Sequence, residues 1–246
     1  MKKQIVLLTV LAILTVNTLL LADIVSINDG MSHTINDYTY LLDTVWLDYP
    51  MVIPNFPGTH VDLAAGGVVT TLVAHNNATI SVTGGTAMGN LVATGSSQVS
   101  MICGDVGGGI SAYRNASVTI AGGMVTFDMR PDLRTNYNGT IYLEGSDFEV
   151  TDLNGNTTIL SNGNKLSDFA SLVEWRPEGD IWDYYTGTIT GTLVNGTILN
   201  SEFNISNTGF YEGTADIVII PEPATVMLLG LGSLALLRKR RHAGQG

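Results

Sequence analysis

Cysteine and basic residues are scarce in this sequence, and each scarcity excludes something. One of the 246 residues is a cysteine, Cys103, so no intramolecular disulfide can form. Only 13% of the residues are charged, and residues 23–220 hold five bases against 21 acids. Such an acidic body repels phosphate backbones, which argues against a nucleic-acid partner. The acidity suits divalent cations or, more simply, keeps the protein in solution.

The motifs of catalysis are also missing. None of the four histidines, His33, His60, His75 and His242, has a partner at a metal-ligand spacing. There is no Gly-x-Ser-x-Gly nucleophile turn and no phosphate-binding loop. We therefore predict that the protein is not an enzyme and has no catalytic residue, metal site or cofactor.

Glycine is abundant, with 28 residues, and many of these glycines belong to a repeat of nineteen residues. The repeated apolar columns are Val61, Ile80, Val99 and Val118; Leu63, Val82, Met101 and Ile120; Leu72, Leu91 and Ile110; and Ala74, Ala93 and Ala112. A glycine column follows, made of Gly66, Gly85, Gly104 and Gly123, with Cys103 in the small-residue position before it. A fixed period near twenty residues is typical of a solenoid.

Within each repeat, apolar residues alternate with small polar ones, as in residues 79–83, 98–101 and 117–120. A period of two predicts strands with one inward face. A strand this short buries that face only by stacking on the next strand, about 4.8 Å away, in parallel pairing. We predict an all-β fold, a parallel β-helix with rungs of about nineteen residues. Analogy with most exported β-helices suggests that it is right-handed.

The repeat becomes irregular at both ends. Trp46, Tyr38, Tyr40 and Phe56 precede the repeat, and we expect them to cover the open end of the core. After Gly123 the next matching strand, residues 138–143, comes 23 residues on instead of nineteen. We place residues 130–134 on a protruding loop and predict a short helix over residues 165–173. Residues 186–193 and 215–220 read as closing strands, with a hairpin turn at Asn195-Gly196.

Aromatic and acidic residues gather between residues 174 and 185. The candidate ligand surface there consists of Trp175, Trp182, Tyr184 and Tyr185, beside the acids Glu174, Glu178, Asp180 and Asp183. Rings beside acids are common where proteins bind carbohydrate, because a ring stacks on a sugar face while carboxylates bind its hydroxyls. A loop that covers the end of the solenoid is the alternative.

Two other functions depend on the repeat columns. A polysaccharide lyase on a β-helix would need acids aligned in one column, whereas these columns carry Thr, Ser, Gln and Asn. Ice binding would need the same Thr-x-Thr pair on successive rungs, but Thr79/Ser81 is followed by Gln98/Ser100 and Ser117/Thr119. Both remain minor alternatives.

Six asparagines begin Asn-x-Ser/Thr triplets. They are Asn77, Asn115, Asn138, Asn156, Asn195 and Asn204. We interpret them as turn residues that adopt positive φ. Glycosylation is the alternative.

The N-terminus has the pattern of a secretory signal peptide. Lys2 and Lys3 precede an apolar run over residues 5–16, and Ala22 is a small residue before Asp23. We predict a signal peptide over residues 1–22 that is cleaved after Ala22. Ser26 is a second candidate cleavage point, and a retained membrane anchor is the alternative interpretation.

The C-terminus carries the most specific pattern in the chain. Pro221-Glu222-Pro223 precedes an apolar stretch over residues 224–237, which ends in the basic residues Arg238, Lys239, Arg240 and Arg241. The apolar stretch is shorter than the roughly 20 residues of a full membrane span, and the basic cluster favours the cytoplasmic side. This segment resembles the PEP-CTERM sorting signal of Gram-negative bacteria that make exopolysaccharide, which is also labelled an ice-binding protein C-terminal domain. The resemblance implies recognition by an exosortase and removal of the tail near the triplet.

Three segments follow from these patterns: a signal peptide (residues 1–22), a β-helix with an N-terminal cap and an irregular C-terminal part (23–220), and a sorting signal (221–246). Within the last, residues 221–223 form a linker, 224–237 a transmembrane helix and 238–246 a basic tail. We expect an exported, non-catalytic structural protein of the cell surface or extracellular matrix, first anchored in the membrane. Its expected partners are exosortase and exopolysaccharide.

Overall fold

A computed structural model of the chain describes residues 22–50, 58–126, 133–136, 138–175, 182–206 and 215–221. In these residues it consists of strands and one 3₁₀ turn, η1 (Leu166–Asp168). The strands are β1 (Ile24–Ile27), β2 (Ser32–Ile35), β3 (Tyr40–Leu47), β4 (His60–Leu63), β5 (Val68–Ala74), β6 (Thr79–Ala87), β7 (Leu91–Gly95), β8 (Gln98–Val106), β9 (Ile110–Arg114), β10 (Ser117–Ile120), β11 (Met124–Val125), β12 (Leu133–Asn136), β13 (Thr140–Thr151), β14 (Thr157–Ile159), β15 (Ser171–Trp175), β16 (Trp182–Leu193), β17 (Ile198–Ser206) and β18 (Asp216–Pro221).

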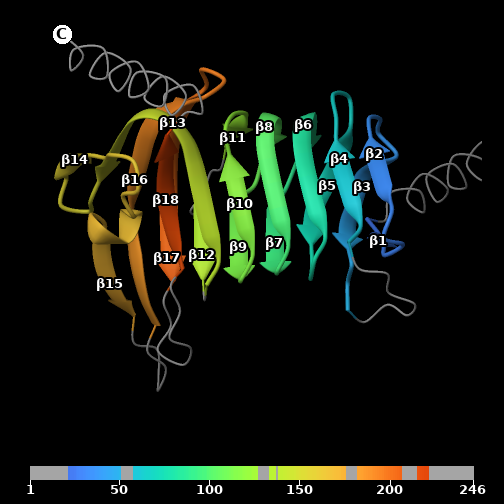
Figure 1. Ribbon diagram of the computed structural model, residues 1–246, viewed down its shortest axis with the longest axis horizontal. Helices are drawn as coiled ribbons and strands as arrows, with labels where there is room; N and C mark the ends of the chain where they lie inside the picture. The colour runs from blue at the N-terminus through green and yellow to red at the C-terminus, as the bar shows by residue number, and fades with distance from the viewer. Residues whose placement is uncertain are drawn as a thin grey trace, which may run out of the picture.

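The strands stack in parallel on three sides of a solenoid, which we name faces A, B and C in chain order. Face A consists of β2, β4, β6, β8, β10, the first part of β13, and β18. Face C consists of β1, β3, β5, β7, β9, β12 and β17. Face B is narrow and joins the start of β5 to the ends of β6 and β8 and to β11. In Figure 1 the turns follow one another along the long axis, which confirms the predicted parallel β-helix.

The stacking register confirms the period of nineteen residues. Val61 pairs with Ile80, Ile80 with Val99, and Val99 with Val118 on face A. The two inward columns of face A over these rungs are at most 3% exposed. Each side chain in such a column is covered by the rungs on both sides, and burying one contributes roughly 1.5–3 kcal/mol. The core is therefore a continuous apolar rod between the faces.

Glycines make the corner between faces A and B. Gly104 and Gly123 both have φ of +94°, a conformation that side chains rarely adopt. A Cβ atom on Gly104 would lie 2.4 Å from the carbonyl oxygen of Gly85 on the rung below. On that lower rung the positive φ falls one residue earlier, at Gly84, and the β6–β8 register shifts beside it. The exposed Cys103 pairs there with Thr83, which fits its predicted place at a corner.

The slip after Gly123 is confirmed, but part of the predicted loop is wrong. Val118 pairs with Ile141, 23 residues later. Leu133 and Arg134 lie in β12, where Leu133 takes the register position above Ile110 on face C. The apolar register position of face C is taken up again at Leu133, so residues 133–136 form a strand that we did not predict. Arg130 and the two residues after it lie outside the described part of the chain.

Residues 146–197 form an insertion that builds an antiparallel sheet at the C-terminal end. β13 leaves face A at Asp147, which has φ of +56°, and the register is irregular from Ser146 to Glu149. It then pairs antiparallel with β14 and β16, and β16 pairs with β15 and β17. The predicted hairpin turn at Asn195-Gly196 is confirmed, with β17 and β18 rejoining faces C and A. Figure 1 shows this sheet at the end of the molecule opposite β1.

The helix predicted over residues 165–173 is wrong in extent. Only the single turn η1 is helical, and residues from Ser171 onward form β15. Pairing with β16 explains the difference, because Leu172 and Val173 take register positions opposite Tyr185 and Tyr184. Tertiary pairing therefore overrides a weak local helical tendency.

Two glycines in β16 make room for two large core side chains, Phe148 of the insertion and Phe203 of β17. A Cβ atom on Gly191 would lie 2.1 Å from Cδ1 of Phe148, and one on Gly187 would lie 3.2 Å from Cζ of Phe203. Both phenylalanines are at most 1% exposed. The Thr-Gly-Thr pattern of β16 thus places glycine on the inward side and threonine on the outward side of the strand.

Candidate functional site

The predicted sorting segment begins at the end of β18, on face A. The register of β18 with β13 runs from Asp216, opposite Thr140, to Pro221, opposite Gly145. Pro221 is therefore part of the folded body, at the position where the strand stops. Glu222, Pro223 and the basic residues Arg238, Lys239, Arg240 and Arg241 lie outside the described part of the chain.

The second edge of β18 is covered by residues 163–167 of the insertion, which we name the clasp. The Gly163 N–H donates to the Ile219 carbonyl at 2.8 Å, and the Ile219 N–H donates to the Asn164 carbonyl at 3.0 Å. Lys165 also forms an isolated antiparallel β-bridge with Val218 through the backbone. Open strand edges pair readily with other chains, so this cover protects the last strand of face A among the described residues.

A buried carboxylate fixes the clasp to the start of β18. The Ser167 hydroxyl donates to Oδ2 of Asp216 at 2.6 Å, and the Ser167 N–H donates to Oδ1 at 3.3 Å. Asp216 is only 5% exposed. Burial raises the pKa of Asp216 above its ordinary value, and the bonds from Ser167 and Ile217 oppose that rise. These two residues are 49 positions apart, and no sequence pattern indicated their contact.

The candidate ligand surface lies on the hairpin of β15 and β16. The backbone register places Trp175 opposite Trp182, and Glu174 opposite Asp183. Tyr184 and Tyr185 are successive residues of β16, so their side chains point to opposite faces of the sheet. Tyr185 packs against the core, which separates it from Tyr184. The four aromatic residues are thus neighbours along the strands, but the two tyrosines do not share one surface.

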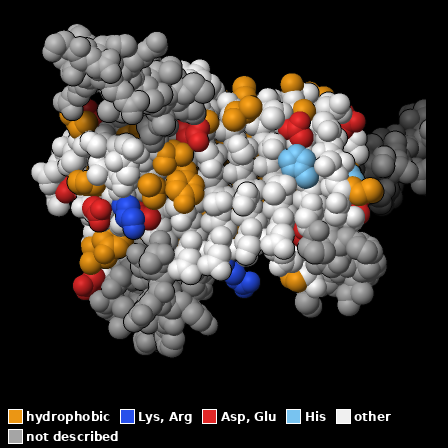
Figure 2. Space-filling view, in the orientation of Figure 1, with side chains coloured by type: hydrophobic (Ala, Val, Ile, Leu, Met, Phe, Trp, Pro, Cys, Tyr) orange, Lys and Arg blue, Asp and Glu red, His pale blue; other side chains and the backbone are white. Residues whose placement is uncertain are grey.

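The outward side of face A is polar and changes from rung to rung. Its two outward columns hold Ser32, His60, Thr79, Gln98, Ser117 and Thr140, and Thr34, Asp62, Ser81, Ser100, Thr119 and Tyr142. His60 Nδ1 lies 2.8 Å from the Thr79 hydroxyl. Figure 2 shows mainly uncharged polar surface across the middle of the molecule. The columns confirm the predicted register, and the irregular residue pairs do not form the repeated array that ice binding needs.

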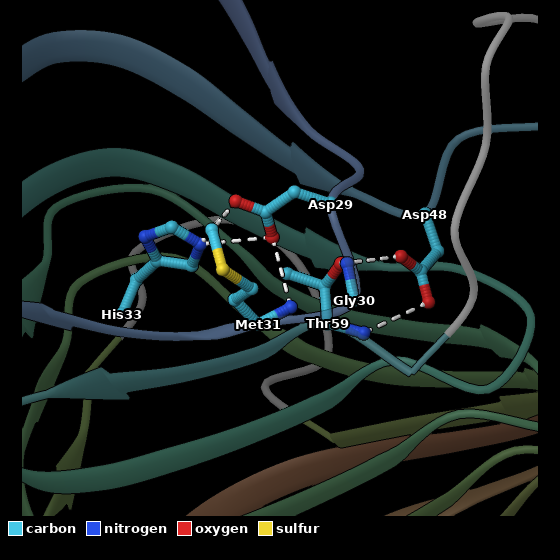
Figure 3. Close-up of polar contacts among 6 residues, drawn as sticks. All are labelled: Asp29, Gly30, Met31, His33, Asp48 and Thr59. Carbon is cyan, nitrogen blue, oxygen red and sulfur yellow. Dashed lines mark hydrogen bonds and ion pairs between the residues drawn. The ribbon is translucent and has the colours of Figure 1, made fainter.

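A polar network closes the N-terminal end. Figure 3 shows the buried Asp48 carboxylate beside Thr59, whose hydroxyl and N–H donate to it at 2.6 and 3.3 Å. The Gly58 N–H donates to the same carboxylate at 2.6 Å. The Thr59 oxygen in turn accepts the Gly30 N–H at 3.1 Å. Asp29 accepts the Met31 N–H and contacts His33 Nε2. Most hydrogen-bond donors in this network are backbone N–H groups, so we interpret the network as stabilising the first turns of the solenoid.

The aromatic residues of the N-terminal cap differ in role. Trp46, Tyr49 and His75 pack together, with ring centroids 4.3–5.8 Å apart. Tyr40 packs against the core, as predicted. Tyr38 is 68% exposed, so the prediction that it covers the core is wrong. It lies in the turn between β2 and β3, where its side chain faces solvent. Phe56 lies outside the described residues.

His75 is the half-buried histidine of this aromatic cluster. Burial lowers the pKa of His75, Arg114 lowers it further, and Asp48 opposes both. Its Nε2 atom is buried without a hydrogen-bond partner among the described residues. The neutral ring is therefore the favoured form.

The sequon asparagines are not the residues with positive φ. Among the described non-glycine residues that conformation occurs at Asp48, Asn76, Arg114 and Asp147. At the corner between faces C and A, two rungs have the positive φ on the residue just before the sequon, at Asn76 before Asn77 and at Arg114 before Asn115. The positive φ that we predicted for the six asparagines is therefore wrong, whereas the turn position is confirmed for Asn77, Asn115, Asn138 and Asn195. Hydrogen bonds explain some of them, since the Asn138 amide donates to Asn115 at 3.0 Å and Asn195 accepts the Thr197 N–H.

In the described part of the chain, no group of three or more His, Cys, Asp or Glu side chains is arranged to hold a metal ion. No helix there is long and apolar enough to cross a membrane. The predicted transmembrane helix over residues 224–237 and nearly all of the predicted signal peptide, residues 1–21, lie outside that part.

Comparison with protein families gives one match, at the C-terminus. A family model of the PEP-CTERM protein-sorting motif matches residues 220–241. The chain carries a PEP-CTERM sorting motif. No curated protein matches the chain, and no solved structure matches its fold.

The PEP-CTERM motif overlaps the folded body by two residues. Ile220 and Pro221 belong both to the matched segment and to β18. A PEP-CTERM motif implies an exported precursor that is anchored in the membrane and recognised by exosortase. Here the motif follows directly from a strand that is paired on one edge by β13 and on the other by the clasp.

Proposed function

We propose that this protein is a non-catalytic structural component of the cell surface or extracellular matrix, delivered there by exosortase. In this proposal the N-terminal signal directs export, the PEP-CTERM motif retains and sorts the precursor, and the β-solenoid is the delivered body. We expect the delivered protein to be surrounded by the exopolysaccharide of the matrix.

The observation that carries the proposal is the direct continuation of face A into the PEP-CTERM motif at Ile220-Pro221. A solenoid of short polar rungs is a rigid rod with a long, regular surface, as suits a structural role. The acidic body and mainly uncharged outward columns of face A also suit a hydrated polymer matrix.

Removal of the motif tests this proposal. Deleting residues 222–246 keeps Pro221 opposite Gly145, so the body retains its last strand. We expect the shortened protein to lose membrane retention and to change location, measured by cell fractionation and immunoblotting. Deleting only residues 242–246, beyond the matched segment, is the control and should change nothing. An unchanged location after the larger deletion would refute sorting by the motif.

Carbohydrate binding through the β15–β16 hairpin is the second candidate function. The observation in its favour is the register that sets Trp175 opposite Trp182 and Glu174 opposite Asp183. Successive pairs alternate between the two faces of the hairpin, so the tryptophan positions would offer ring-to-sugar stacking on one face and the acidic positions would offer carboxylate bonds to hydroxyls on the other.

A glycan array with purified protein tests this candidate. We expect bound glycans to be lost in Trp182→Ala and retained in Tyr142→Ala, which removes an outward ring from face A instead. Binding that survives Trp182→Ala would argue against the hairpin. Turnover of the polysaccharide would instead indicate a lyase or hydrolase.

A further inference from the structure

The first hydrogen bonds of the solenoid begin one residue after Ala22. β1 pairs with β3 from Ile24 opposite Thr44 to Ile27 opposite Leu47. The Thr44 N–H donates to the Asp23 carbonyl at 2.9 Å, so Asp23 is already fixed beside β3. Ala22 is exposed. The boundary between exposed chain and paired strand therefore lies at Ala22-Asp23.

This boundary separates the two candidate cleavage points of the signal peptide. Cleavage after Ser26 would remove Ile24, Val25 and Ser26, which are three of the four residues of β1. It would leave the edge of β3 without its partner and uncover the core beside Ile27, which packs against it. Cleavage after Ala22 leaves every described pair of β1 and β3 in place.

A carboxylate already faces the nitrogen atom that cleavage after Ala22 would free. The Asp23 N–H donates to Oδ1 of Asp43 at 3.1 Å. The Asp23 carboxylate is engaged with the next N–H group, of Ile24, at 2.8 Å. Asp43 is thus the acceptor for the Asp23 nitrogen.

The charge of this region favours a cation at that point. Residues 23–113 hold seven aspartates and no lysine or arginine. Hydrolysis of the Ala22-Asp23 peptide bond consumes one water, leaves a carboxylate on Ala22 and frees the amine of Asp23, which takes up a proton at neutral pH. Conversion of an amide N–H donor into an ammonium donor makes the bond to a carboxylate charge-assisted and stronger.

We propose that the exported protein begins at Asp23 and that its new α-ammonium group is held by the Asp43 carboxylate. This inference rests on the proposed export. Removal of the signal peptide then completes the first turn, because the Asp43 carboxylate, which accepts an amide N–H of Asp23 in the precursor, gains an ammonium partner when the peptide bond is cut.

The N-terminal residue of the exported protein is the first test. The full chain is produced in an exporting Gram-negative host, and the protein recovered from the envelope and medium is analysed by N-terminal sequencing and intact mass. We expect Asp23. A protein beginning at Ile27 would overturn this assignment and leave export standing, and so would a protein in the envelope that still begins at Met1, as a retained anchor would give. Protein found only in the cytoplasm would overturn export as well.

The role of Asp43 is tested by the reactivity of the new amine. An amine-selective acylating reagent at neutral pH, followed by mass spectrometry of the N-terminal peptide, measures how strongly the ammonium is held. We expect acylation to be about two- to fivefold faster in Asp43→Asn, in line with a partly exposed ion pair. Asp37→Asn is the matched control, because among the described residues the Asp37 carboxylate bonds to Thr39 and not to the Asp23 nitrogen, and it should react like the unchanged protein. Equal rates in all three would overturn the role of Asp43.

Discussion

The regular rungs between β4 and β11 and the inserted sheet between β13 and β17 bury apolar side chains in different ways. In the rungs, small and medium side chains such as Ala93 and Val99 repeat in columns, and each is covered by identical positions above and below. At the inserted sheet, two phenylalanines, Phe148 of the insertion and Phe203 of the returning strand β17, fill the core against glycines of β16. Repetition spreads the packing energy over many similar contacts, whereas the insertion concentrates it in a few large ones.

The largest expected effect breaks that concentrated packing. Phe148→Ala should lower the free energy of unfolding by about 3–5 kcal/mol, since a fully buried ring is lost and a cavity remains. Urea denaturation followed by far-ultraviolet circular dichroism measures the loss. Ala93→Gly, which removes one methyl group from a column of the rungs, is the comparison and should cost about 1 kcal/mol.

The second prediction addresses the corners of the rungs. Gly104→Ala should cost about 2–4 kcal/mol, because φ of +94° is combined with a Cβ atom pressed against the Gly85 carbonyl. Gly155→Ala is matched in φ, at +82°, but its Cβ atom meets nothing within 4 Å. It should cost about 1 kcal/mol, and equal costs for both in thermal unfolding would show that stacking does not require glycine at the corner.

The third prediction concerns the clasp. Ser167→Ala removes a donor from the buried Asp216 carboxylate and should cost about 1–3 kcal/mol. Ser171→Ala, whose hydroxyl accepts the exposed Leu153 N–H, should cost under about 1 kcal/mol. Amide hydrogen exchange should also show faster exchange at Ile219 in Ser167→Ala alone. Unchanged exchange there would mean that the clasp holds β18 without Ser167.

The smallest expected effects are two pH dependences of the folding stability, which have opposite signs and come from Asp216 and His75. The pKa of Asp216 is raised by burial above 3.8, so the folded state binds the proton more tightly than the unfolded state. The stability that this group contributes is present at low pH and is lost as pH rises from 3.8 through the raised pKa. Subtracting the pH profile of Asp216→Asn from that of the unchanged protein, both from urea denaturation, should reveal this fall.

His75 gives the reverse dependence. Its pKa is lowered from 6.5, chiefly by burial, so the folded state favours the neutral ring. The corresponding stability is present above pH 6.5 and is lost as pH falls below 6.5 through the lowered pKa. His75→Gln should flatten the profile in that range, and an identical acid-side slope in both proteins would contradict the assignment.

The same contrast explains how much could be predicted from the sequence. Columns such as Val61, Ile80 and Val99 gave the period, the parallel stacking and the slip to Ile141, because repetition turns a long-range contact into a local pattern. The PEP-CTERM motif could be recognised for a related reason, since its parts follow one another in a short segment.

The insertion has no repeat, so its contacts left no such trace. The bond between Ser167 and Asp216 joins residues 49 positions apart, and β15 forms only because β16 is present to pair with it. The gathering of aromatic residues between residues 174 and 185 could be predicted from composition. The placement of Tyr184 and Tyr185 on opposite faces could not, because it depends on which face of β16 packs against the core. Sequence patterns showed where the departures lie, and the pairing of distant strands decided their form.

The pairing of β18 with β13 on one edge and with the clasp on the other has a mechanical consequence. β13 holds one edge of this strand and the clasp holds the other, up to Ile219. A pull along the axis of β18 would load the hydrogen bonds of both edges in shear, so they would have to yield together. A precursor held in the membrane by its C-terminal segment would pass such tension into the solenoid through β18.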